Sequence, residues 1–169
     1  AIGGTINIYT KRPKKGFHKD FNYNTGLNGL QNIAGSISGA SENNSFYLGL
    51  ERFHTDGISS MMHNDEKDRY RNNSIIAKYD YKFSNKLKFK TNLRYADTYL
   101  QYDKVIDTAT ATHDEEVDGT EASYNMSIVY DANKKFTNNL TVAKTYIKRI
   151  YAATENSGNA LQDNYYGDR

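Results

Sequence analysis

The sequence contains no cysteine and no tryptophan, and Pro13 is its single proline. Without cysteine the chain forms no disulfide, performs no thiol chemistry and builds no cysteine-ligated zinc site. Its longest apolar run is Ile150–Ala153, whereas a membrane-spanning helix needs about 20 apolar residues. The 22 Lys and Arg residues against 20 Asp and Glu leave a net charge of +2, too even for a nucleic-acid-binding surface.

Aromatic residues are plentiful, because the chain holds 15 Tyr and 7 Phe although only 37% of it is hydrophobic. Disordered chains are normally poor in aromatics, so we expect this one to fold. Apolar and polar residues alternate with a period of two, which predicts β-strands with two different faces.

The clearest alternation lies at residues 87–95, where Leu87, Phe89 and Leu93 alternate with Lys88 and Arg94. The same pattern predicts six further strands, at about residues 17–26, 33–40, 46–51, 75–83, 122–131 and 136–151. In the last of these, Lys144 and Lys148 fall on the apolar face. No segment predicts a helix.

The connections are expected to alternate in length. Tight turns are predicted near residues 42–44, 84–85 and 132–135, and long loops at about 54–70 and 103–120. Long strands, short turns at one end and long loops at the other are typical of a transmembrane β-barrel, whereas soluble strands average about five or six residues. Tyrosines near strand ends, such as Tyr79, Tyr81 and Tyr130, suit either an aromatic girdle or ordinary cross-strand packing. The main alternative is a soluble antiparallel sandwich.

The first twelve residues, AIGGTINIYTKR, are the most specific stretch of the chain. They resemble the AIGGxINIxTKR segment that ends the plug domain of TonB-dependent outer-membrane receptors, with Ile2, Gly3, Gly4 and Asn7 as motif residues. The resemblance implies an all-β protein in which residues 1–14 end a plug and residues 15–169 begin a transmembrane antiparallel barrel. About seven of roughly 22 barrel strands would lie here. We therefore expect a piece of a longer protein, which does not fold stably alone because its strand edges are unpaired.

A second resemblance follows the third predicted strand. Residues 55–59 (TDGIS) and 69–74 (RYRNNS) resemble the second outer loop and fourth strand of the cobalamin receptor subgroup, although Arg69 stands where Gly is usual. The resemblance implies a receptor in the bacterial outer membrane, surrounded by lipid and lipopolysaccharide. An inner-membrane TonB-type energy transducer would drive import of a scarce, large small-molecule substrate. We take His54, Asp56 and Tyr102 as candidate substrate contacts.

Acidic residues gather in the two predicted long loops, and calcium prefers six to eight oxygen ligands. Loops of this kind bind calcium in cobalamin receptors. By resemblance, the candidate metal ligands are Glu66 and Asp68 on one loop and Asp103 and Asp118 on the next. The acids are equally compatible with simple solvation, or with divalent ions that bridge lipopolysaccharide.

Catalysis finds little support, because the four histidines are scattered along the chain, and we expect no catalytic residues and no enzyme. Three alternatives to a cobalamin receptor stay open. A siderophore receptor would need cationic loops to grip anionic iron chelates, whereas these loops are acidic. A passive porin would lack the plug motif. A secreted, soluble β-rich enzyme domain would need no membrane.

Overall fold

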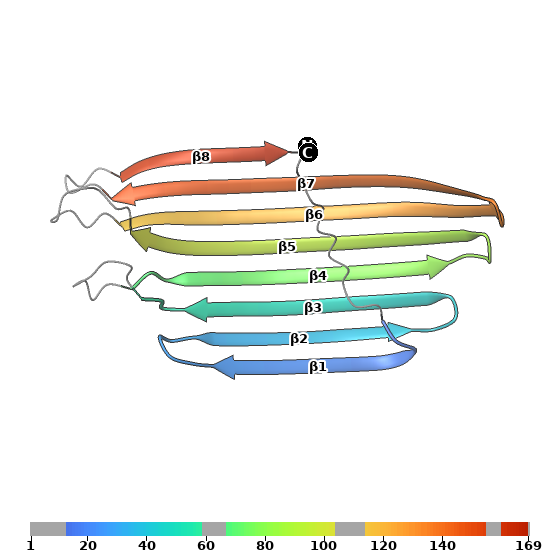
Figure 1. The fold of residues 1–169 in the computed structure, drawn as a ribbon, viewed down its shortest axis with the longest axis horizontal. Helices are drawn as coiled ribbons and strands as arrows, with labels where there is room; N and C mark the ends of the chain where they lie inside the picture. Colours follow the sequence, from blue (N-terminus) through green and yellow to red (C-terminus); the bar gives the residue numbers. More distant parts are fainter. Residues whose placement is uncertain (1–12, 59–66, 104–113, 155–159, 169) are drawn as a thin grey trace, which may run out of the picture.

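The computed structural model describes residues 13–58, 67–103, 114–154 and 160–168, which form one eight-stranded antiparallel sheet (Figure 1). The strands are β1 (Gly16–Thr25), β2 (Gln31–Ala40), β3 (Asn44–Thr55), β4 (Tyr70–Lys82), β5 (Leu87–Asp103), β6 (Asp114–Asn133), β7 (Phe136–Thr154) and β8 (Ala160–Asp168). The prediction of an all-β chain is confirmed. In the described part no helix is long and apolar enough to cross a membrane.

The strands pair in sequence order, so the sheet is a succession of hairpins. The turns after β2, β4 and β6 share one end of the sheet, which we call the turn end. The connections after β1, β3, β5 and β7 share the opposite end, which we call the loop end (Figure 1). The predicted tight turns are confirmed at residues 41–43, 83–86 and 134–135.

The structure differs most from the sequence prediction at two places. The predicted loop at residues 103–120 is shorter, because β6 already begins at Asp114, which pairs with Asp103. The acidic residues from Asp114 to Asp118 suggest a loop, yet they continue the ladder with β5. An eighth strand, Ala160–Asp168, pairs with β7 and was not predicted, because this polar segment lacks an apolar alternation.

The register places the predicted apolar residues on one face across seven strands. One row runs from Phe21 on β1 through Gly35, Leu50, Ile75, Tyr95 and Ala122 to Tyr146 on β7. The next row toward the turn end comprises Lys19, Ile37, Leu48, Ala77, Leu93, Tyr124 and Lys144. We call this surface the apolar face. Its lysines lie on β1 and β7, and the five strands between them contribute uncharged side chains to both rows.

The opposite face is polar and carries ion pairs between neighbouring strands. Nζ of Lys88 lies 3.0 Å from the carboxylate of Asp131. The carboxylate of Glu121 contacts both Arg94, at 3.1 Å, and Arg149, at 3.5 Å. Arg94 and Glu121 come from β5 and β6, and Arg149 comes from β7, so these contacts tie three adjacent strands together. We call this surface the charged face.

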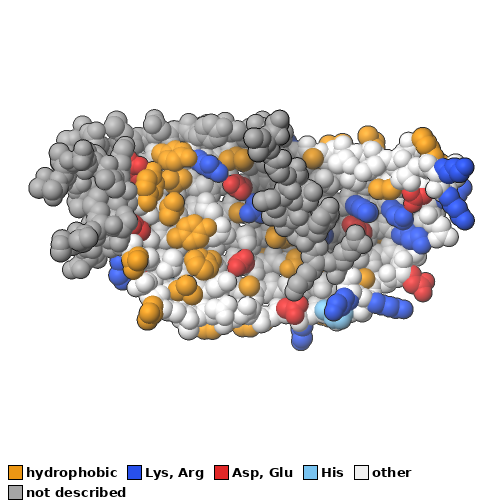
Figure 2. Space-filling view, viewed as in Figure 1, with side chains coloured by type: hydrophobic (Ala, Val, Ile, Leu, Met, Phe, Trp, Pro, Cys, Tyr) orange, Lys and Arg blue, Asp and Glu red, His pale blue; other side chains and the backbone are white. Residues whose placement is uncertain are grey.

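The sheet has almost no core of its own. Among the described residues Ala96, 1% exposed, is the one buried apolar side chain, whereas Phe21, Leu50 and Leu93 are about half exposed or more. A single layer cannot enclose its own apolar surface, and among the described residues no second layer packs against the apolar face. Figure 2 shows hydrophobic side chains at the surface of the face in view.

Candidate functional site

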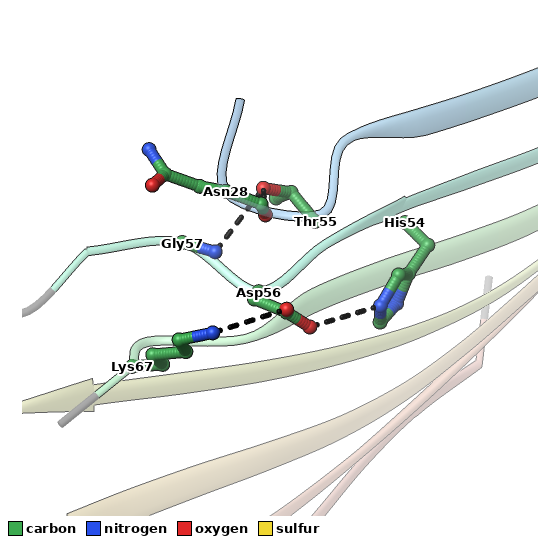
Figure 3. A network of polar contacts seen from close by, with 6 residues as sticks. All are labelled: Asn28, His54, Thr55, Asp56, Gly57 and Lys67. Carbon is green, nitrogen blue, oxygen red and sulfur yellow. Dashed lines mark hydrogen bonds and ion pairs between the residues drawn. The ribbon is translucent and has the colours of Figure 1, made fainter. Parts of the chain in front are cut away.

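A network of polar contacts at the loop end joins two chain segments that lie far apart in sequence (Figure 3). The carbonyl oxygen of Asn28, in the turn between β1 and β2, accepts two hydrogen bonds. The backbone N–H of Asp56 donates one at 2.8 Å, and the hydroxyl of Thr55 donates the other at 3.1 Å. The Thr55 oxygen in turn accepts a hydrogen bond from the N–H of Gly57 at 3.1 Å. The end of β3 is thereby fastened to the first hairpin.

The side chain of Asp56 lies at the centre of this network, between a histidine and a lysine (Figure 3). Its Oδ1 lies 3.3 Å from Nε2 of His54, and its Oδ2 lies 3.3 Å from Nζ of Lys67. The hydrogen bond and positive charge of Lys67, helped by His54, lower the pKa of the Asp56 carboxyl below its ordinary value of 3.8. Asp56 is therefore ionised at neutral pH. We call Asn28, His54, Thr55, Asp56, Gly57 and Lys67 the loop clasp.

Two glycines make the loop clasp possible. Gly29 and Gly57 have φ angles of 66° and 69°, in the left-handed region that side chains rarely adopt. A Cβ on Gly29 would clash with the Asp56 carboxylate, and a Cβ on Gly57 would clash with the carbonyl of Asp68. Gly57 and Asp68 thus bring the two arms of the β3–β4 connection together.

A second polar group lies where β5 and β6 extend toward the loop end. The amide of Gln101 donates to Glu116 at 3.1 Å. Burial and a hydrogen bond to Glu116 raise the pKa of Tyr99 to about 12. Across the ladder, a hydrogen bond to Glu115 raises the pKa of Tyr102 to about 12. Both tyrosines are therefore neutral hydrogen-bond donors at physiological pH, held by adjacent carboxylates.

The predicted substrate contacts fall in both groups. His54 and Asp56 belong to the loop clasp, as their spacing in sequence allows. Tyr102 does not join them: the register pairs His54 with Arg71 and Arg71 with Tyr99, so Tyr102, three residues further on, lies on the opposite face. Tyr102 extends the charged face, whereas His54 extends the apolar face.

The predicted metal ligands are not brought together within the described residues. Asp118 pairs with Tyr99, whereas Asp103 pairs with Asp114, so the two aspartates are offset by four residues, or about 13 Å along the ladder. Asp68 contacts the Gly57 segment, and Glu66 lies outside the described residues, as do Ile2, Gly3, Gly4 and Asn7 of the plug motif. In the described part no group of three or more metal-ligating side chains occurs.

Sequence reasoning missed several residues that hold the site together. Asn28 acts through its backbone carbonyl, which any residue carries, so no side-chain pattern identifies it. Lys67 lies eleven residues from Asp56 and reaches it only because the loop folds back. Glu115 and Glu116 could have been found from the sequence if the strand had been extended to Asp114, because each then lies directly opposite a polar residue of β5.

The site can bind a polar ligand through ionic contacts and hydrogen bonds. It offers a carboxylate, neutral phenols and cationic side chains at the end of a sheet. Comparison with known family models, with characterised proteins and with solved structures finds no match for this chain.

Proposed function

We propose that this sheet is part of the wall of an outer-membrane receptor that imports a scarce, large substrate by TonB-coupled active transport. The observation that carries the proposal is the separation of the two faces. The register keeps apolar residues on one face through seven consecutive strands, and the opposite face carries the Lys88–Asp131 and Arg94–Glu121 ion pairs. An ion pair between Arg71 and Asp97 also lies on the apolar side of the sheet, beyond Tyr95 toward the loop end. Lipid would cover the apolar face, and the charged face would line a water-filled interior.

The dimensions of the apolar face support a membrane wall. On β5 it extends from Leu87 to Tyr95, about 27 Å at 3.4 Å per residue. Strands tilted by about 40° would project roughly 20 Å onto the membrane normal, close to the apolar band of about 25 Å found in such barrels. Aromatic rings mark the turn-end border, where Tyr81 contacts both Tyr79 and Phe83, at ring-centroid distances of 6.4 and 4.8 Å.

The loop clasp would then lie outside the cell, beside the substrate path. It fastens the β3–β4 connection to the first hairpin and so holds Asp56 in a fixed place. Tyr102, on the charged face near the same end, would point toward the interior. Under this proposal Tyr102 contacts the substrate inside the barrel, and the loop clasp contacts it above the rim, outside the lipid.

Energy coupling and substrate class rest on the two sequence resemblances. The AIGGTINIYTKR segment favours a receptor with a plug over a passive porin. The TDGIS and RYRNNS segments favour cobalamin over an iron chelate, as do the acidic loop residues. A siderophore receptor is the second candidate.

The test is energy-dependent uptake by cells whose sole outer-membrane receptor is the full-length protein. Labelled cobalamin should bind to the surface with and without a proton-motive force, and should accumulate only with one. Accumulation of ferric siderophore instead would establish the second candidate. Passage that is insensitive to an uncoupler, and that shows no saturable binding, would indicate a porin and overturn the proposal.

A calcium site is a separate part of the proposal, because its candidate ligands include Glu66 and the side chain of Asp103, which lie outside the described residues. Substrate should bind the full-length receptor more tightly with added calcium than with chelator. Asp103→Asn combined with Asp118→Asn should abolish that difference while barrel assembly continues. Equal affinities in the two conditions for the unmodified receptor would contradict a calcium role.

A further inference from the structure

The turn end of the sheet carries an excess of lysine. These lysines precede β1, end β4 or lie in the turns after β4 and β6: Lys14, Lys15, Lys82, Lys86, Lys134 and Lys135. We call them the lysine rim. Glu42 is the one acidic residue in the three turns. Figure 2 shows Lys and Arg side chains gathered toward the right-hand end, where Figure 1 places the turns.

The charge of the lysine rim is not balanced within the described residues. The ion pairs described there all involve other cations, and the nearest, Lys88 with Asp131, is satisfied internally at 3.0 Å. Lys134 and Lys135 are adjacent in the turn after β6, so their positive charges repel one another, and an external anion would relieve that repulsion.

The position of the lysine rim relative to the apolar face indicates which anion. Tyr81 lies on that face beside Lys82, and Phe83 follows in the turn. Phe136 follows Lys135 directly and is 57% exposed. Aromatic rings settle at the boundary between hydrocarbon and headgroups, and lysines just beyond them extend their amines into the headgroup layer. With the apolar face in lipid, the lysine rim would lie at the depth of the lipid phosphates.

We propose that the lysine rim binds the phosphates of anionic phospholipids at the membrane surface next to the turns. This inference rests on the proposed function, because it needs the apolar face to lie in lipid. A lysine amine is a compact charge that binds a phosphate without fixed geometry, which suits mobile headgroups. Each lysine near an anionic surface strengthens binding by about fivefold.

The test is lipid binding to the purified full-length protein in micelles of neutral detergent. The probes are a short-chain phosphatidylglycerol and the phosphatidylcholine of equal chain length. The unmodified protein should bind phosphatidylglycerol at least tenfold more tightly. Lys134→Gln with Lys135→Gln should weaken phosphatidylglycerol binding about tenfold or more and leave phosphatidylcholine binding unchanged. Lys134→Arg with Lys135→Arg should retain the preference, because the charge persists.

The matched control is Arg52→Gln with Arg69→Gln, which removes the same charge nearer the loop end and should leave phosphatidylglycerol binding unchanged. An equal loss in this control, or equal binding of the two lipids, would overturn the inference. Competition by millimolar inorganic phosphate alone would identify a free-phosphate site instead and would also overturn it. If the protein binds both lipids equally yet imports substrate, the inference fails and the proposed function stands. If it stays soluble without detergent, the proposed function fails with it.

Discussion

Gly29 and Asp56 approach so closely that a Cβ on Gly29 would lie 2.6 Å from the Asp56 carboxylate oxygen. The turn between β1 and β2 therefore positions the central side chain of the loop clasp, although 27 residues separate the two in the sequence. A side chain at position 29 would displace the carboxylate from His54 and Lys67.

Gly29→Ala should weaken substrate binding by the full-length receptor without preventing assembly. The added methyl group displaces Asp56, and the left-handed backbone costs about 1–2 kcal/mol in addition. Gly16→Ala is the matched control, because Gly16 also has a positive φ, 89°, yet a Cβ there would meet nothing closer than 4.0 Å. Substrate affinities measured for both variants should differ. A loss of equal size in the control would assign the effect to backbone strain alone.

Lys67→Met should raise the pKa of Asp56 toward 3.8, because the hydrogen bond from Lys67 is the largest cause of its lowering. The native pKa of Asp56 is below its unfolded value. The contribution of the ionised Asp56 carboxylate to the stability of the folded protein is therefore fully present above pH 3.8, and it is lost as the pH falls through the lowered pKa. Carboxyl NMR titration of the receptor measures this directly. Lys86→Met, at the opposite end of the sheet, should leave the Asp56 titration unchanged, and an equal shift in both variants would contradict the clasp.

Leu93→Arg should impair assembly of the full-length protein, whereas Asn92→Arg should be tolerated. Leu93 lies between Ala77 and Tyr124 on the apolar face, and Asn92 lies between Lys78 and Asn125 on the charged face. An arginine near the membrane centre destabilises the assembled barrel by about 2–4 kcal/mol where it faces lipid. It has little effect where it faces a water-filled interior. Heat-modifiable mobility of the extracted protein reports assembly. If the two arginines act alike, lipid does not cover the apolar face.

Glu115→Gln should lower the pKa of Tyr102 from about 12 toward its ordinary value of 10, because the hydrogen bond to Glu115 is the main cause of the increase. Since the native pKa of Tyr102 is raised, its stabilising contribution is complete below pH 10 and is lost as the pH rises through 12. Ultraviolet titration of phenolate formation, with Tyr102→Phe to assign the signal, gives the measurement. Glu121→Gln is the control, because Glu121 pairs with Arg94 and Arg149 instead. This variant should leave the pKa of Tyr102 unchanged.

The alternation of apolar and polar residues predicted which side chains share a face of the sheet. It did not predict features that depend on how distant segments pair, such as the start of β6. Leu87, Phe89 and Leu93 share a face because successive side chains in a strand point to opposite sides, which periodicity alone reveals. The start of β6 at Asp114 was missed because four acidic residues within five positions look like a loop. They remain in the ladder because β5 supplies partners, among them Gln101 and Tyr102.

The candidate site was predicted in part for the same reason. His54 and Asp56 are two residues apart, so their contact follows from local chain geometry. Lys67 and Gly29 join them only through the return of the β3–β4 connection and the neighbouring hairpin, which no local pattern encodes. Tyr102 was also predicted to contact the substrate, but it lies at the end of β5, where it is hydrogen-bonded to Glu115 and separate from the loop clasp.

Strict pairing of each strand with its neighbour in sequence has a consequence for how the sheet is built. Every pairing in the described sheet joins consecutive strands, so each requires closure of only a short segment of chain, and the entropy cost of such closure rises slowly with length. Topologies dominated by such local pairings form faster than those that join distant segments. The open edge of each completed hairpin offers its backbone groups to the strand that follows. The order in which strands emerge during synthesis is therefore also an order in which they can add to the sheet, with β1 as its first edge.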